Sequence, residues 1–206
     1  MSRYIGPKCR LCRREKMKLF LKGERCFSAA CPIEKKGAVP PGQQGLKSSR
    51  RPSDYGKQLR EKQKAKRLYG LSESHLKNYF QKAIKVKQAT GEVLLQMLES
   101  RLDNVVYRLG FVSSRNLARQ LVSHRHVLVD GEKVNIPSYQ LKPSQVVSLD
   151  KKALDLTEVK KSLAEKPKLP AWLKRKAAVG QIVRLPKRDE LEGDIDEQLI
   201  VEFYSR

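Results

Sequence analysis

The sequence has few of the features from which enzymes build reactive sites. It contains three histidines, and it has neither a phosphate-binding loop nor a His-Glu-x-x-His motif. Aromatic residues make up only 6% of the chain, which is low for one large self-contained core. No apolar run approaches the ~20 residues of a membrane span, and the opening MSRYIGP lacks the apolar stretch of a signal peptide. These absences argue against an enzyme and a membrane protein, and predict small domains in a protein that stays in the cytoplasm.

Acidic residues are also scarce, above all in the first part of the chain. The 206 residues include 44 Lys and Arg against 22 Asp and Glu, which gives a formal charge of +22. Residues 1–90 hold 24 basic and 6 acidic side chains, whereas residues 91–206 hold 20 and 16. A nucleic acid is the natural partner for such an excess of positive charge.

The only four cysteines lie in one short window, as Cys9-x2-Cys12-x13-Cys26-x4-Cys31. Two close pairs separated by a loop are typical of a tetrahedral zinc site in which all four ligands come from the protein. Such a site leaves no open position for catalysis, so we predict one structural zinc ion that stabilises a very polar segment. An iron–sulfur cluster remains open as an alternative, and so do two disulfides or free thiols.

The densest positive charge follows a linker at residues 40–45. Residues 47–67 hold nine basic side chains and two acidic ones, and Ser53 or Asp54 can cap a helix that stops at Gly70. The scarcity of acids predicts a surface kept positive for an anion, although a solvated face or a disordered basic arm is the alternative. A second helix is predicted after Ser72 or Ser74.

Two further helices are predicted before the pattern changes. The first runs from Thr90 to Gly110, with leucines at helical spacing down one face. The next begins after Ser113 or Ser114. On it, Arg115 and Arg119 are four residues apart and are predicted to lie on the exposed side, where two guanidinium groups can bind adjacent phosphates.

From residue 127 the apolar residues alternate, which predicts strands. Residues 127–129, an Asp-Gly turn and residues 133–136 form a predicted β-hairpin, and residues 146–149 form a third strand. Residues 151–178 are predicted to be partly helical. The segments 181–186 and 197–204 are predicted to be strands of a tail that docks back on the protein.

Together these elements predict an α+β fold. Residues 1–45 form a four-cysteine metal knuckle with its linker, and residues 46–91 form a basic helical segment. Residues 92–155 form a small αα-βββ RNA-binding domain, and residues 156–206 form a C-terminal extension that packs on the helical domain.

The segment ESRLDNVVYRLGF at residues 99–111, followed by SRxxARQLV at residues 114–122, resembles the RNA-binding domain named after bacterial small-subunit ribosomal protein four. The resemblance to that ribosomal protein family extends to RPSDY at residues 51–55, LREKQK at residues 59–64 and the ending EQL…EFYSR. The opening and the cysteine window resemble its zinc-bearing branch. The chain departs from the family at Arg125, where glycine is usual, and at Pro143-Ser144-Gln145, where a Pro-Gly-Asp turn is frequent.

The resemblance implies a primary binder of 16S ribosomal RNA that nucleates assembly of the small (30S) subunit. It also implies contacts with ribosomal protein five, with other 30S proteins and with messenger RNA where it enters the subunit, and a part in translational accuracy. The residues predicted to bind RNA are the following basic and imidazole side chains: Arg3, Arg10, Arg13, Arg14, Arg25, Lys47, Arg50, Arg51, Lys57, Arg60, Lys62, Lys64, Arg67, Arg115, Arg119, His124 and His126.

Two alternatives from other classes share parts of this pattern. An RNA-modifying enzyme can carry the same RNA-binding module, but the remaining residues are too few for a catalytic domain. A zinc-containing DNA-binding regulator can combine cysteines with basic helices, but the sequence lacks a recognisable dimer-forming segment and recognition helix.

Overall fold

The computed structural model describes residues 4–43, 45, 51–165, 169–191 and 194–206 of the chain. The chain divides into two compact units. The first comprises Met1–Leu94 and Glu192–Arg206, and the second comprises Leu95–Leu191. Helix α5 (Thr90–Glu99) spans this division. Within the described ranges, no helix is long and apolar enough to cross a membrane.

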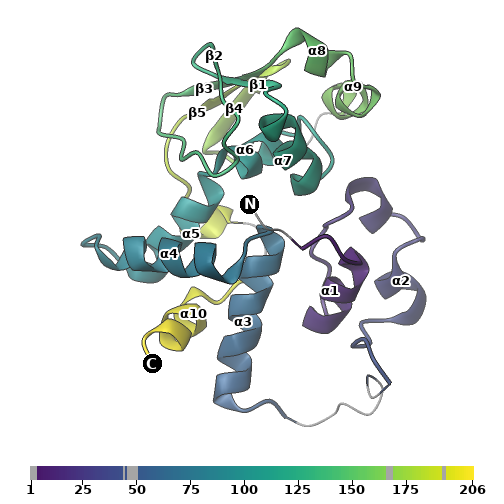
Figure 1. Cartoon of the computed structure of the whole chain (residues 1–206), viewed down its shortest axis with the longest axis vertical. Coiled ribbons are helices and arrows are strands. Elements are labelled where there is room, and N and C mark those ends of the chain that lie inside the picture. Colours follow the sequence, from purple (N-terminus) through teal and green to yellow (C-terminus); the bar gives the residue numbers. More distant parts are fainter. Residues whose placement is uncertain (1–3, 44, 46–50, 166–168, 192–193) are drawn as a thin grey trace. The chain divides into compact units, whose positions relative to one another are not determined.

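The first unit is helical (Figure 1). It contains α1 (Lys8–Glu15), a 3-10 turn (Gly23–Cys26), α2 (Pro32–Lys36), α3 (Asp54–Leu68), α4 (Glu73–Ile84) and α10 (Glu197–Tyr204). The hydroxyl groups of Ser53 and Ser72 accept hydrogen bonds from the backbone N–H groups of Gly56 and His75, and so cap α3 and α4. Gly70 adopts a left-handed conformation just after α3, at φ 63°. Both helices predicted in this region are confirmed.

The C-terminal segment returns to the first unit as helix α10, which packs along α3 and against α4 (Figure 1). The predicted strand over residues 197–204 is therefore wrong. Asp196 caps the helix, because its Oδ1 accepts hydrogen bonds from the backbone N–H groups of Gln198 at 3.0 Å and Leu199 at 3.3 Å. The apolar residues of this segment fit a helical period as well as an alternating one, and the cap favours the helix.

The predicted long helix from Thr90 to Gly110 is two helices, α5 and α6 (Leu102–Arg108). Between them, Arg101 has the extended conformation of an N-cap residue, at φ −65° and ψ 138°. The backbone N–H of Leu102 donates to the carbonyl oxygen of Tyr139 at 2.9 Å, so a partner distant in sequence replaces the helical one. The leucine periodicity continues through this break and does not reveal it.

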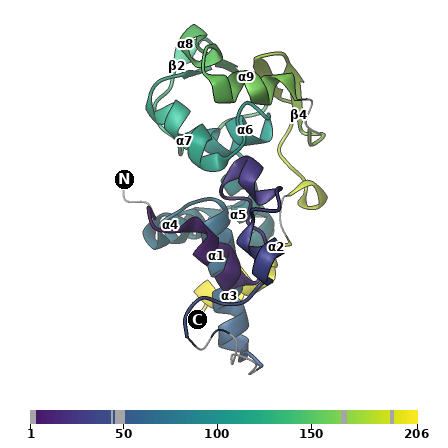
Figure 2. The same cartoon turned by 90° about the vertical axis from the view of Figure 1, so that its right-hand side faces the viewer.

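The second unit packs helices against one antiparallel sheet. After α6 it contains α7 (Arg115–Ser123), β1 (Val127–Val129), β2 (Glu132–Lys133), β3 (Val146–Leu149), α8 (Lys151–Leu154), α9 (Thr157–Ala164), β4 (Leu173–Lys176), β5 (Val179–Ile182) and a 3-10 turn (Arg188–Glu190). Helices α6 and α7 pack against each other (Figure 2). The predicted order of two helices and three strands is confirmed, although β2 ends at Lys133 and the hairpin is shorter than predicted.

The sheet has five strands in the order β2-β1-β3-β5-β4. Strand β5 pairs with β3, with Val147 opposite Gly180, and β4 continues the sheet beyond β5. A Cβ atom at Gly180 would lie 2.4 Å from a methyl group of Leu109, so only glycine allows the sheet to approach α6 this closely. Trp172 and Ile182 belong to the same core as α6 and α7. The second unit therefore extends past residue 155, the predicted end of the RNA-binding domain.

Candidate nucleic-acid interface and metal site

The four cysteines line one small pocket in the first unit. Cys9 and Cys12 lie three residues apart on α1, Cys26 ends the 3-10 turn, and Cys31 is the N-cap residue of α2. The backbone N–H of Lys22 donates to the Sγ of Cys26 at 3.3 Å. Folding therefore gathers the two predicted pairs, which are separated by 13 residues in the sequence, around a cavity of about 20 Å³. That volume is enough for a single water-sized species.

The sulfur atoms are not arranged as metal ligands in the structure. All four cysteines are free, and no group of three or more His, Cys, Asp or Glu side chains among the described residues is placed to hold a metal ion. Burial raises the pKa of the Cys12 thiol, and repulsion from Cys26, Cys9 and Cys31 adds to this effect, against a hydrogen bond from the backbone of Leu19. Four thiolates around one pocket would repel one another, and a cation between them would offset that repulsion.

Most of the cations on helix α3 that were predicted to bind RNA are buried or paired with carboxylates of the protein. Lys62 and Lys64 are only 5% and 8% exposed. Lys62 Nζ lies 2.8 Å from Glu73 Oε1, while Lys64 Nζ contacts Glu61 and the carbonyl oxygen of Asp194. Carboxylates therefore neutralise part of the positive charge that the sequence predicts for this segment, and RNA binding by its remaining cations stays a prediction.

Two arginines of α3 contact one buried carboxylate from α1. Arg60 Nη1 lies 3.3 Å from Glu15 Oε1, Arg67 forms a second ion pair with the same oxygen, and the side chain of Glu15 is only 2% exposed. Burial raises the pKa of Glu15, and the two guanidinium groups oppose this shift. Arg60 and Arg67 therefore link α3 to α1, the first helix of the segment that carries the four cysteines (residues 8–36, the cysteine segment).

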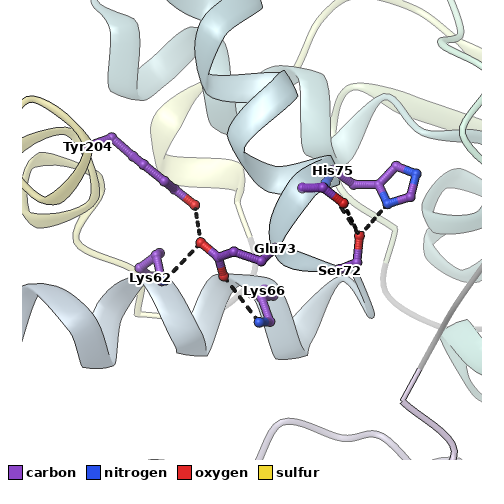
Figure 3. A network of polar contacts seen from close by, with 7 residues as sticks. Lys62, Lys66, Ser72, Glu73, His75 and Tyr204 are labelled. Atoms are coloured by element: carbon purple, nitrogen blue, oxygen red, sulfur yellow. Dashed lines mark hydrogen bonds and ion pairs between the residues drawn. The ribbon is translucent and has the colours of Figure 1, made fainter.

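Glu73 at the start of α4 holds the tail helix in place (Figure 3). Its carboxylate accepts hydrogen bonds from Lys62 Nζ and the Tyr204 hydroxyl, both at 2.8 Å, and from Lys66 Nζ at 3.1 Å. Burial alone would raise the pKa of Glu73, but these three hydrogen bonds outweigh it and hold the pKa below its ordinary value. Burial and the bond to Glu73 raise the pKa of Tyr204. Lys62 also lies 4.3 Å from the ring centroid of Phe203, so one lysine contacts both aromatic residues of α10.

Arg115 and Arg119 on α7 are half-buried, which contradicts the prediction that they lie on an exposed face. Arg115 Nε donates to Asn104 Oδ1 at 2.8 Å, and its guanidinium carbon lies 4.4 Å from the ring centroid of Tyr107. Arg119 Nη1 lies 3.5 Å from Asp103 Oδ2, and its side chain is 13% exposed. Both arginines are oriented by the neighbouring helix α6.

A buried polar network supports these contacts, and the sequence analysis missed it. Asp103 accepts two hydrogen bonds from Arg101, at 3.0 and 2.7 Å, and Glu99 accepts two from Arg108, both at 3.0 Å. Asn104 Nδ2 donates to Glu99 Oε2 at 2.7 Å. The signal in the sequence is a cluster of charged residues that interrupts an apolar helical pattern.

The other predicted RNA-binding residues divide by exposure. Five are exposed: Arg10, Arg14, Arg25, Arg51 and His124. Arg13 is half-buried and donates to the carbonyl oxygens of Val39 and Pro40, and half-buried Lys57 pairs with Asp54. His126 is half-buried, with its ring centroid 6.2 Å from that of His124. Arg3, Lys47 and Arg50 lie outside the described residues.

Known protein families match both parts of the chain. Residues 3–99 match the ribosomal protein S4/S9 N-terminal domain, and residues 100–147 match the S4 domain. Small ribosomal subunit protein uS4 of Dictyoglomus turgidum is 54% identical over 208 residues, and that of Thermus thermophilus is 50% identical over 210 residues. Each alignment covers 100% of both proteins.

The chain belongs to the uS4 family of small ribosomal subunit proteins. Membership of this family confirms the resemblance found in the sequence. It also confirms the prediction that the protein is a structural component of the ribosome and not an enzyme. The S4 domain match covers α6, α7, strands β1 and β2 and the start of β3, so strands β4 and β5 extend the sheet beyond the matched segment.

Proposed function

We propose that the chain is a primary 16S ribosomal RNA-binding protein that nucleates assembly of the 30S subunit in the cytoplasm. Membership of the uS4 family supports this role. The structural observation that carries it is the set of cations that stay exposed after the internal ion pairs have formed. Arg10 and Arg14 are four residues apart on α1 and both exposed, so their guanidinium groups can reach neighbouring phosphates.

A second group of RNA contacts is proposed at the corner between α7 and β1. His124 and Arg125 are exposed there, and His126 follows them. Arg125 has a left-handed conformation, at φ 62°, which the family's usual glycine adopts without strain. Arg115 and Arg119 complete this group, held by Asn104 and Asp103. The internal contacts reduce the conformational entropy that these arginines would lose on binding RNA.

Replacing Arg10 and Arg14 together with alanine is expected to weaken binding to a 16S 5′-domain fragment. Loss of two phosphate contacts predicts that the slope of log K against log salt becomes shallower by about 1.4 to 1.8 units. The melting temperature is expected to stay unchanged, because both side chains are exposed. Titrations at several salt concentrations measure the slope. The Arg10→Lys/Arg14→Lys variant is the control and keeps the parent slope, whereas a parent slope in the alanine variant would contradict the proposed site.

We also propose that Cys9, Cys12, Cys26 and Cys31 hold one structural zinc ion, with an iron–sulfur cluster as the less favoured alternative. The shared pocket and the mutual repulsion of the four sulfurs support a cation at this place. The ion would stabilise a segment that has few apolar residues of its own.

Protein purified under reducing conditions is expected to contain one zinc ion per chain by elemental analysis. Cys12→Ser is expected to lose it, because a neutral hydroxyl replaces a thiolate ligand. Ser28→Ala, a change at an exposed site in the same segment, serves as the control that retains zinc. Metal-free parent protein, or iron and sulfide in place of zinc, would contradict the zinc assignment.

Contacts with ribosomal protein five, with other 30S proteins and with messenger RNA are proposed on the basis of the family resemblance. Exposed apolar residues in and just after β5, Val179, Val183 and Leu185, support a protein contact on the second unit. A part in translational accuracy is proposed through the contact with protein five.

A further inference from the structure

Phe27 is the most exposed aromatic side chain among the described residues, and it follows the 3-10 turn of the cysteine segment. It is 71% exposed, and its ring is stacked on that of Phe20, with centroids 4.9 Å apart and an angle of 25° between the planes. Phe20 contacts one side of the Phe27 ring, while most of the residue faces solvent. A large apolar ring held in water in this way has a surface available for a planar ligand.

Phe20 is a fixed support for this ring. It is half-buried, it lines the cysteine pocket, and its neighbours Leu19 and Leu21 are buried. Its backbone has φ 48°, a left-handed conformation that is uncommon for a bulky residue. The surrounding packing maintains this conformation, so the base of the stacked pair is rigid.

The chemistry around Phe27 suits RNA better than a protein partner. An open hollow beside the ring is lined by Ser28, Ala29, Glu34 and Lys35. Residues 16–36 contain six basic side chains against two acidic ones. Lys22 and Arg25, which precede Phe27 by five and two residues, are both exposed. Lysine is depleted in protein–protein interfaces, whereas an aromatic ring flanked by cations is the usual arrangement for a nucleobase with its phosphates.

We propose that the Phe20–Phe27 pair is a stacking platform for one unpaired nucleobase of ribosomal RNA. The base stacks on the outer face of Phe27, and Lys22 and Arg25 bind the adjoining phosphates. This inference rests on the proposed RNA-binding function and adds a base-stacking site to its phosphate contacts.

The Phe27→Ala variant of the full chain tests the platform. Its affinity for the 16S 5′-domain fragment is expected to fall about 5- to 150-fold, the range found when one stacked base loses its aromatic partner. The slope of log K against log salt is expected to stay the same, because no phosphate contact is removed. Phe27→Trp is expected to bind like the parent, with its fluorescence quenched by RNA, and Trp172, the single natural tryptophan, is buried and gives a constant background.

A fluorescent base analogue in the RNA identifies the nucleotide that stacks on Phe27. Unpaired adenines of the fragment are replaced one at a time with 2-aminopurine, and one of them is expected to be quenched by the parent protein and not by Phe27→Ala. Ile84→Ala, which removes an apolar side chain that is 56% exposed on the same unit, is the control and leaves binding and quenching unchanged. Circular dichroism and metal content show that each variant is folded.

Parent-like affinity of Phe27→Ala would overturn the platform, as would quenching that persists in that variant. Intact RNA binding combined with failure to bind a purified 30S protein would also overturn it, because Phe27 would then be a protein contact. If the parent chain itself does not bind the fragment, the proposed RNA-binding function fails instead, so the two failures are distinguishable.

Discussion

Asp103→Ala is expected to lower the free energy of unfolding of the second unit by about 3 to 5 kcal/mol, the usual cost of removing one partner of a buried ion pair. Asp103 is 5% exposed and accepts two hydrogen bonds from Arg101, which is 1% exposed. Without the carboxylate, a buried guanidinium loses its counter-ion, and Arg119 loses the oxygen that orients it. Urea denaturation, followed by far-ultraviolet circular dichroism, measures the effect.

Two further variants test whether the effect comes from the buried ion pair or would follow the loss of any carboxylate in this unit. Asp155→Ala removes a carboxylate that is 83% exposed and pairs with Lys160, so less than about 1 kcal/mol is expected. The double variant Arg101→Met/Asp103→Leu is expected to recover most of the lost stability, since apolar residues can replace a buried ion pair. If Asp103→Ala were as mild as Asp155→Ala, the buried network would not stabilise the unit.

Arg60→Ala/Arg67→Ala is expected to destabilise the first unit by about 3 to 5 kcal/mol near pH 7, because the two changes remove both arginines that form ion pairs with the buried carboxylate of Glu15. Burial already raises the pKa of Glu15, and loss of the two cations raises it further. A carboxyl whose pKa is raised in the folded state contributes stability at low pH and loses it as pH rises through that pKa. The stability difference between variant and parent is therefore expected to shrink as pH falls from neutral toward the ordinary pKa of a glutamate, about 4.3.

Glu15→Gln in the same double variant is the decisive comparison. A neutral amide needs no counter-ion, so this triple variant is expected to be more stable at neutral pH than the double variant. The difference in unfolding free energy between the triple variant and the parent is expected not to shrink as pH falls. Thermal melts at several pH values measure both. A difference between the double variant and the parent that is constant with pH would mean that Glu15 is not the source of the instability.

The helix starts could be predicted because their signals are local. Ser53, Ser72 and Ser114 each precede a helix, and each side chain accepts the expected backbone hydrogen bond. The break at Arg101 could not be predicted, since it depends on the carbonyl of Tyr139, which is distant in sequence. The short strand β4 has the sequence LKRK, which shows no apolar alternation, so its place at the sheet edge depends on pairing with β5.

The ion pairs of the candidate site could not be predicted either, because they also depend on residues distant in the sequence. The basic residues of α3 are evident in the sequence, but their partners Glu15 and Glu73 come from other helices. A count along one segment therefore overestimates its free positive charge. By contrast, the exposure of Arg10 and Arg14 follows from a local pattern on α1, where buried Cys12 faces the protein.

The central claim, specific binding of ribosomal RNA by a structural protein of the small subunit, is tested most directly by competition. The purified chain is bound to a labelled 16S 5′-domain fragment at near-physiological salt, and unlabelled fragment or duplex DNA is added. We predict that the unlabelled fragment displaces the label at concentrations about a thousandfold or more below those needed for duplex DNA. Equal competition by the two nucleic acids would mean that the chain binds polyanions by charge alone, and would contradict the claim.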